Sequence, residues 1–228
     1  MTDMSLASAA PAPHMQRVMI YSRYERFWHW TQAALIIVLA LSGFVVHGTI
    51  GGVPFATAVK VHAFAAGALI ALWIFTIFWH VVTGEWRQFV PHGDIFKVMK
   101  FYAFGIFSGA PAPYRKSPWR KQNPLQALTY LTFVVLNGLG LWISGLAYFT
   151  YPLWAKAIAG TLDLPQVAFV HTACAFLMVT FVIIHVYMIT TGKTPGHDIS
   201  VMLSGHDTVE IDPVDEAYLK AHHEKGLG

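Results

Sequence analysis

One stretch of the sequence decides the fold: residues 169–189, FVHTACAFLMVTFVIIHVYMI. It contains no Asp, Glu, Lys or Arg, and it is long enough to cross a hydrocarbon core, which needs about 20 helical residues. Its apolar run does not alternate with polar residues, as the strands of a membrane barrel would. The stretch therefore predicts a transmembrane helix, and this helix carries two histidines, His171 and His185.

Three further stretches have the same character, so we expect an all-α integral membrane protein built as a four-helix bundle. The expected spans are residues 28–48, 57–82, 126–151 and 166–191. The composition agrees, because 55% of the 228 residues are hydrophobic and only 12% are charged, whereas soluble domains carry about a quarter charged residues. With Cys174 as the single cysteine, a disulfide scaffold is excluded.

The positive charges predict the orientation. All but two of the 15 Lys and Arg residues lie before the first span, between the second and third, or after the fourth; the exceptions are Lys60 and Lys156. By the positive-inside rule, both termini and the long middle loop should be cytoplasmic. The basic balance thus has an explanation that involves no nucleic acid.

Three parts of the chain are expected. Residues 1–16 should be a cytoplasmic tail, residues 17–193 the four-helix domain, and residues 194–228 a polar, solvated cytoplasmic tail. Within the middle loop, residues 94–107 have apolar side chains at roughly helical spacing together with two lysines. This pattern predicts an interfacial helix between helices two and three; an ordinary loop packed on the bundle is the alternative.

Histidines inside the spans are the candidate functional residues, because ionisable groups are costly in a membrane. His171 and His185 lie within roughly 40° of one helix face and about 21 Å apart along the axis. With the predicted orientation, His62 matches His171 in depth at the outer side, and His29 matches His185 at the inner side. His80 shares the face of His62 and the inner depth, so it is an alternative partner of His185.

Two matched histidine pairs favour two haems with two histidine ligands each. A zinc or di-iron site would normally add Cys or carboxylate ligands, and no Asp or Glu occurs within the expected spans. A CxxCH motif is absent from the sequence, so the haems should be non-covalent and of the b type. Gly43 lies at the depth of the outer pair, where a missing side chain would admit a macrocycle.

Several motifs together resemble a known family. They are R-x-x-H-W at residues 26–30, a histidine early in span two, N-x-x-Q before span three and H-x13-H in span four. Over residues 17–210 the chain resembles the di-haem cytochrome b subunits of respiratory complexes. That family includes the formate dehydrogenase gamma subunit, the b-type cytochrome of nickel-iron hydrogenase and thiosulfate reductase cytochrome b.

The resemblance implies roles for individual residues. His62 and His171 would bind the outer haem, His29 and His185 the inner haem, and His80 would have no matching ligand role. Asn123 and Gln126 would contact a quinone, menaquinone or ubiquinone, beside the inner haem together with His185. Asn123 also suits a helix N-cap because proline follows it. Arg26 would pair with a haem propionate or simply mark the membrane boundary.

The resemblance also implies a function. Such a subunit, anchored in a bacterial inner membrane, passes electrons between a periplasmic oxidoreductase partner and the quinone pool. The partner would be a formate dehydrogenase-like or hydrogenase-like enzyme, with an iron-sulfur protein or a multihaem cytochrome c making the contact. Two alternatives remain open: a stand-alone cytochrome b quinol oxidoreductase and a transporter with a histidine relay.

Overall fold

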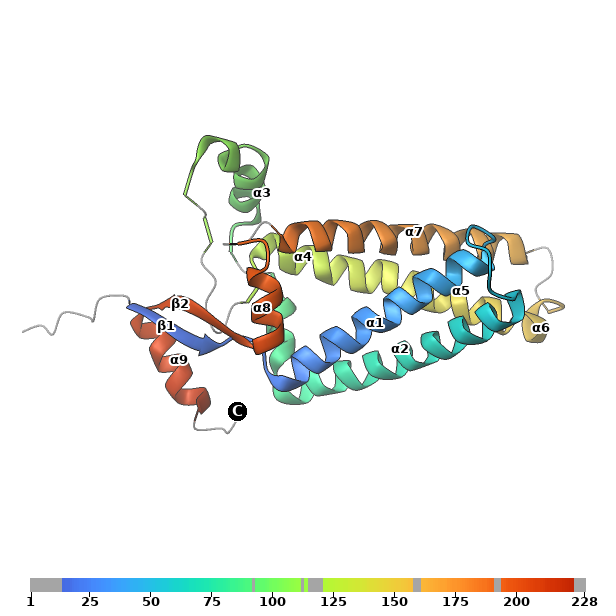
Figure 1. Ribbon diagram of the computed structural model, residues 1–228, viewed down its shortest axis with the longest axis horizontal. Helices are drawn as coiled ribbons and strands as arrows, with labels where there is room; N and C mark the ends of the chain where they lie inside the picture. The colour runs from blue at the N-terminus through green and yellow to red at the C-terminus, as the bar shows by residue number, and fades with distance from the viewer. Residues whose placement is uncertain are drawn as a thin grey trace, which may run out of the picture.

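Four long helical segments form the body of the computed structural model (Figure 1). The structure describes residues 14–91, 93–111, 113–114, 121–157, 161–190 and 194–223. The segments are α1 Arg23–Val46, α2 Phe55–Thr83, α4 Pro124–Thr132 continuing through the π-helical turn η3 Phe133–Gly138 into α5 Leu139–Phe149, and α7 Leu164–Ile189. All are long and apolar enough to cross a membrane, so the prediction of four spans is confirmed.

The helix starts follow from local capping. Ser22 and Glu25 form a capping box at the start of α1, so this helix begins before the expected residue 28 and includes Glu25. Asn123 and Gln126 form a second capping box at the start of α4, with proline at the first helical position. Such boxes satisfy backbone N–H groups that a helix start leaves free.

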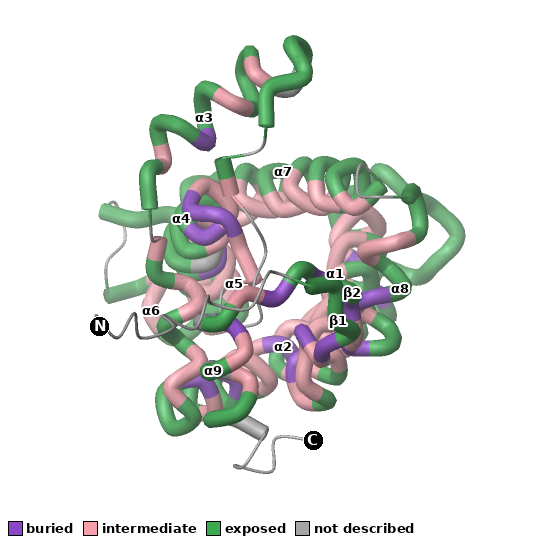
Figure 2. Tube along the Cα trace, turned by 90° about the vertical axis from the view of Figure 1, so that its left-hand side faces the viewer, coloured by how far each residue is buried: buried purple, intermediate pink, exposed green. Residues whose placement is uncertain are grey.

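Backbone packing between the long helices is most extensive in two pairs, α1 with α2 and α5 with α7. Large apolar side chains point outward along all four segments; Phe78 and Ile183, for example, are 62% and 64% exposed. In Figure 2 the exposed residues of α7 lie on the side turned away from the other helices. This is the expected surface of a bundle whose outer face contacts lipid tails rather than water.

Short elements gather at the two ends of the bundle. At the end where β1 and β2 also lie, the structure has η1 Glu85–Phe89, α3 Ile95–Ala103, η2 Gly105–Ser108, α8 His197–Ser204 and α9 Pro213–His223 (Figure 1). The short helix α6 Tyr151–Trp154 lies at the opposite end. Following the predicted orientation, we call these the inner end and the outer end. The membrane face that each end meets stays a prediction.

The middle loop contains the helix expected from residues 94–107. Asp94 caps α3 by accepting a hydrogen bond from the backbone N–H of Lys97, and this bond is the main reason that the pKa of Asp94 is lowered. The helix projects from the bundle at the inner end (Figure 1). Its placement in a membrane interface remains a prediction.

The described residues near the two ends of the chain form a two-stranded ribbon, which the expectation of a solvated C-terminal tail did not include; residues 1–13 of the expected N-terminal tail and residues 224–228 lie outside the described residues. Strand β1, His14–Met19, pairs antiparallel with β2, His206–Ile211, so the protein is mostly but not entirely helical. Val18, Ile20, Val209 and Ile211 form a small apolar core of this ribbon. Because the strands are short and nearly the whole chain separates them, hydropathy periodicity alone does not reveal their pairing.

Candidate cofactor-binding sites

The structure brings the candidate histidines together in two pairs. The ring centroids of His62 on α2 and His171 on α7 are 6.2 Å apart, and those of His29 on α1 and His185 on α7 are 6.3 Å apart. Two imidazole nitrogens on one metal ion, each at the usual distance of about 2.0–2.1 Å, leave the centroids roughly 6 Å apart. Both pairs are therefore spaced to hold a metal ion between them.

A serine hydroxyl lies beside each outer histidine. Nδ1 of His62 is 3.0 Å from Oγ of Ser42, and Nδ1 of His171 is 3.1 Å from Oγ of Ser144. Each hydroxyl donates its own hydrogen to a carbonyl four residues earlier in its helix. It therefore accepts from the Nδ1–H group of the histidine, which leaves the Nε2 lone pair free to bind a metal.

Glycines let the outer rings approach the neighbouring helices. A Cβ atom on Gly43 would lie 3.4 Å from Cε1 of His62, and one on Gly145 would lie 3.2 Å from Cε1 of His171. Each glycine directly follows the serine that contacts the same histidine. The serine and the glycine together thus seat each ring against its neighbour.

The inner pair has different surroundings. The His185 ring stacks on Phe181 with the planes 12° apart, and Phe181 stacks on Phe133 at 4.3 Å. Nδ1 of His29 is buried without a hydrogen-bond partner in the described part of the chain. Aromatic rings, rather than hydroxyl groups, therefore surround this pair.

The donor set fits haem. Within the described residues, no group of three or more His, Cys, Asp or Glu side chains could hold a metal ion, so each pair offers two protein ligands. Haem brings the remaining four ligands in its own macrocycle and needs two axial ones from the protein. The spacing of the pairs, the free Nε2 positions and the adjacent glycines are consistent with this cofactor.

His80 does not join either pair. Its buried ring donates from Nδ1 to the carbonyl of Thr76 at 2.8 Å and contacts Trp28, Trp79 and Phe89 edge to face. In the structure, His29 is the side chain that faces His185. The geometry thus favours His29 over His80 as the inner partner.

Arg26 connects α1 to the C-terminal segment. Its Nη1 donates to the carbonyl of Leu203 in α8 at 2.6 Å. Its Nε is buried and has no partner among the residues described, so this donor remains for an anionic group. Arg26 therefore tethers α8, and its contact with a haem propionate stays a prediction.

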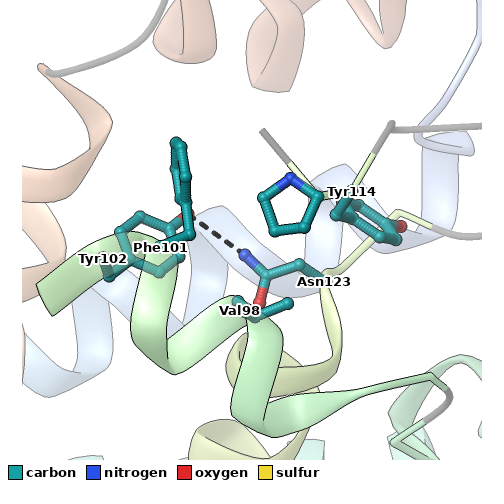
Figure 3. A pocket seen from close by; sticks show the side chains of 6 residues that line it. Val98, Phe101, Tyr102, Tyr114 and Asn123 are labelled. Atoms are coloured by element: carbon teal, nitrogen blue, oxygen red, sulfur yellow. Dashed lines mark hydrogen bonds between the residues drawn. The ribbon is translucent and has the colours of Figure 1, made fainter. Parts of the chain in front are cut away.

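Asn123 and Gln126 act as helix caps in the structure. Oδ1 of Asn123 accepts from the backbone N–H of Gln126, and Oε1 of Gln126 accepts from that of Asn123. Nδ2 of Asn123 donates to the hydroxyl of Tyr102 at 3.2 Å, beside a cavity that Val98 and Tyr114 also line (Figure 3). That cavity measures about 50 Å³, far below the roughly 300–1,000 Å³ of small-molecule sites. Quinone contact by these residues stays a prediction.

Several polar residues were not predicted from the sequence. Within the expected spans the dipeptide Ser-Gly occurs at 42–43 and 144–145, and this repetition inside the membrane segments is the signal that could have indicated the two serines. Asn137 lies in the π-helical turn with both side-chain polar atoms buried and unpaired among the described residues. π-Helical turns occur frequently at functional sites, but hydropathy gives no sign of one.

Four membrane-spanning helices with facing histidine pairs define a membrane cytochrome of the b type. Comparison with protein families agrees with this class. The family model described as prokaryotic cytochrome b561 matches residues 20–205, and the chain belongs to this family. The family and the four spans indicate a bacterial membrane protein that holds b-type haem.

Similar proteins bear related names. The chain is 30% identical over 205 residues to "Putative cytochrome YdhU" of Escherichia coli (strain K12), covering 85% of this chain and 76% of that protein. It is 23% identical to "Probable Ni/Fe-hydrogenase B-type cytochrome subunit" of Rhodobacter capsulatus, over 87% of this chain and 84% of the relative. A protein of the same name in Cupriavidus necator is 25% identical, over 88% and 91%. No solved structure is significantly similar. The expected resemblance to cytochrome b subunits is confirmed.

Proposed function

We propose that this chain is a di-haem cytochrome b subunit that conducts electrons across the bacterial inner membrane. The observation that supports this most is the spacing of two histidine pairs, His62 with His171 and His29 with His185. In each pair, the two ring centroids are as far apart as those of two imidazoles on one metal ion. On α7 the two histidines are about 21 Å apart along the helix axis. Each pair would hold one haem, near opposite sides of the membrane.

Some side chains of the two sites would hold the cofactors, and others exclude water from them. Haem bound at each pair would supply one-electron redox chemistry. The four histidines would hold the two haems, and Ser42 and Ser144 orient the outer two histidines. Stacked rings such as Phe181 and Phe133 fill the space beside the inner pair and keep it apolar.

The inner end is the proposed place of quinone chemistry. Reduction of a quinone requires protons, and an end of the bundle next to water can supply them. Asn123 and Gln126 lie there at the start of α4. The amide nitrogen of Asn123 donates one of its two hydrogens to Tyr102, so Asn123 keeps one donor for a quinone carbonyl, and the amide nitrogen of Gln126 offers a second donor group beside it.

A partner on the outer side would exchange electrons with the outer haem. Two relatives are named as B-type cytochrome subunits of Ni/Fe-hydrogenase, which supports partnership with a catalytic subunit. The proposed contact is an iron-sulfur protein or a multihaem cytochrome c. A purified chain that occurs without any such partner and still oxidises quinol would favour a stand-alone quinol oxidoreductase.

A reduced-minus-oxidised visible spectrum with extracted haem counted per chain tests the proposal. We expect two non-covalent b haems in the unaltered protein and one in each of His171→Ala and His185→Ala. His47→Ala is the matched control, because His47 is exposed after α1 and contacts Thr49 rather than another histidine. Full haem content in both variants would overturn the ligand assignment, and a folded protein without haem would favour a histidine relay.

A further inference from the structure

The two histidine pairs differ in what their Nδ1 atoms contact. Both outer histidines have a serine hydroxyl within hydrogen-bond distance of Nδ1. In the inner pair, His29 Nδ1 is buried without a partner among the described residues. The two pairs therefore differ in the groups that contact Nδ1, and not in the Nε2 atoms that would bind the metal.

The outer arrangement is built twice, from different helices. Ser42 on α1 meets His62 on α2, and Ser144 on α5 meets His171 on α7. In both places the next residue is a glycine that lies against the same histidine ring. Two independent helix pairs thus reach the same geometry, which a chance packing contact would not be expected to reproduce.

The direction of these hydrogen bonds is fixed by the serines' second contact. Oγ of Ser42 lies 2.7 Å from the carbonyl of Val38, and Oγ of Ser144 contacts the carbonyl of Gly140. A carbonyl oxygen can only accept a hydrogen bond, so each hydroxyl donates its single hydrogen to that carbonyl. The serine oxygen therefore accepts from Nδ1–H, and each histidine is held in the form whose Nε2 binds metal.

We propose that Ser42 and Ser144 are positioning residues that hold the outer haem at a lower reduction potential than the inner haem. The inference rests on the proposed di-haem function. A serine oxygen that accepts a hydrogen bond from Nδ1–H makes the imidazole a more basic ligand. A more basic ligand stabilises the oxidised form of the iron. The inner pair has no comparable hydroxyl acceptor among the hydrogen bonds of the described residues. Electron flow from the outer to the inner side would then be downhill, toward the proposed quinone end.

A redox titration of the purified holoprotein, followed in the visible spectrum, tests the inference. His171→Ala and His185→Ala assign each spectral component to the outer or inner haem. In unaltered protein we expect the outer haem to have the lower midpoint potential. In Ser42→Ala and Ser144→Ala we expect the midpoint potential of the outer haem to rise. At a fixed applied potential, the ratio of reduced to oxidised outer haem should increase several-fold, which corresponds to the loss of one modest hydrogen bond. The midpoint potential of the inner haem should stay constant.

Two further variants separate hydrogen bonding from packing. Ser42→Thr and Ser144→Thr keep the hydroxyl and should retain the original midpoint. Thr180→Val is the matched control, because Thr180 donates to its own helix at Phe176 and is exposed on α7 without contacting a histidine. If an alanine variant loses the outer haem and the threonine variant restores it, the positioning role is supported.

Four results would overturn the inference: a lower potential at the inner haem, an unchanged outer midpoint in both alanine variants, an equal shift in Thr180→Val, or loss of haem that threonine fails to restore. Failure of the proposed function would look different. It would appear in the unaltered protein as a haem count other than two.

Discussion

The carboxylate of Glu25 and the ammonium of Lys121 form an ion pair of 2.6 Å in which each side chain is only 10% exposed. The pair joins the start of α1 to the segment that leads into α4, so it connects the two helix pairs at the inner end. Lys121 also lies over the ring of Tyr21, 5.6 Å from its centroid. Burial, and next the charge of Glu25, raise the pKa of Tyr21, so this tyrosine stays neutral beside the ion pair.

Lys121→Met should destabilise the protein by about 3–5 kcal/mol, because it leaves the Glu25 carboxylate buried without its cation. Adding Glu25→Gln should recover part of the loss, since glutamine carries no charge and can still cap Ser22. Thermal unfolding in detergent, followed by circular dichroism, measures both variants. A double variant that is less stable than Lys121→Met would contradict the argument.

Glycines in the spans should respond to alanine according to the space beside them. A Cβ on Gly138 would lie 2.9 Å from Cζ3 of Trp73, so Gly138→Ala must displace the indole and should cost about 1–3 kcal/mol. Gly67 has nothing within 4 Å, so Gly67→Ala should stabilise α2 by about 0.5–1 kcal/mol. Unfolding midpoints that shift in the same direction in both variants would count against this distinction.

The sequence was sufficient to predict the four spans, because an uninterrupted apolar run of about 20 residues is typical of a transmembrane helix. Helix geometry also predicted the depth match between His62 and His171 and between His29 and His185, whose rings the structure places beside each other. These features depend on local periodicity. They need no knowledge of how distant segments meet.

Features that depend on distant contacts were not predicted. Nothing near Ser42 in the sequence indicates that its hydroxyl reaches His62, because the contact depends on how α1 and α2 pack. The β1–β2 ribbon joins residues near the two ends of the chain, and Lys121 lies far from Glu25 in sequence. In each case tertiary packing, rather than local pattern, selects the partner.

The ribbon should depend on Ile211, which is fully buried. Ile211→Ala should destabilise the ribbon by about 2–5 kcal/mol through lost burial and a cavity. Met15→Ala on the paired strand is the matched control, because Met15 is 62% exposed and its loss should stay within about 0.5 kcal/mol. Hydrogen-deuterium exchange of the amides in residues 14–19 and 206–211 reports this local opening. Equal exchange in the two variants would show that the apolar core does not hold the strands together.

His80→Phe should leave the haem content unchanged. Phenylalanine fills a similar volume among Trp28, Trp79 and Phe89. It loses only the hydrogen bond to the Thr76 carbonyl, which should lower the free energy of unfolding by about 0.5–1.5 kcal/mol. His29→Phe is the comparison, because it removes the ring that faces His185 and should remove the inner haem. Haem extracted per chain distinguishes the two variants. A haem lost from His80→Phe but retained in His29→Phe would transfer the ligand role to His80.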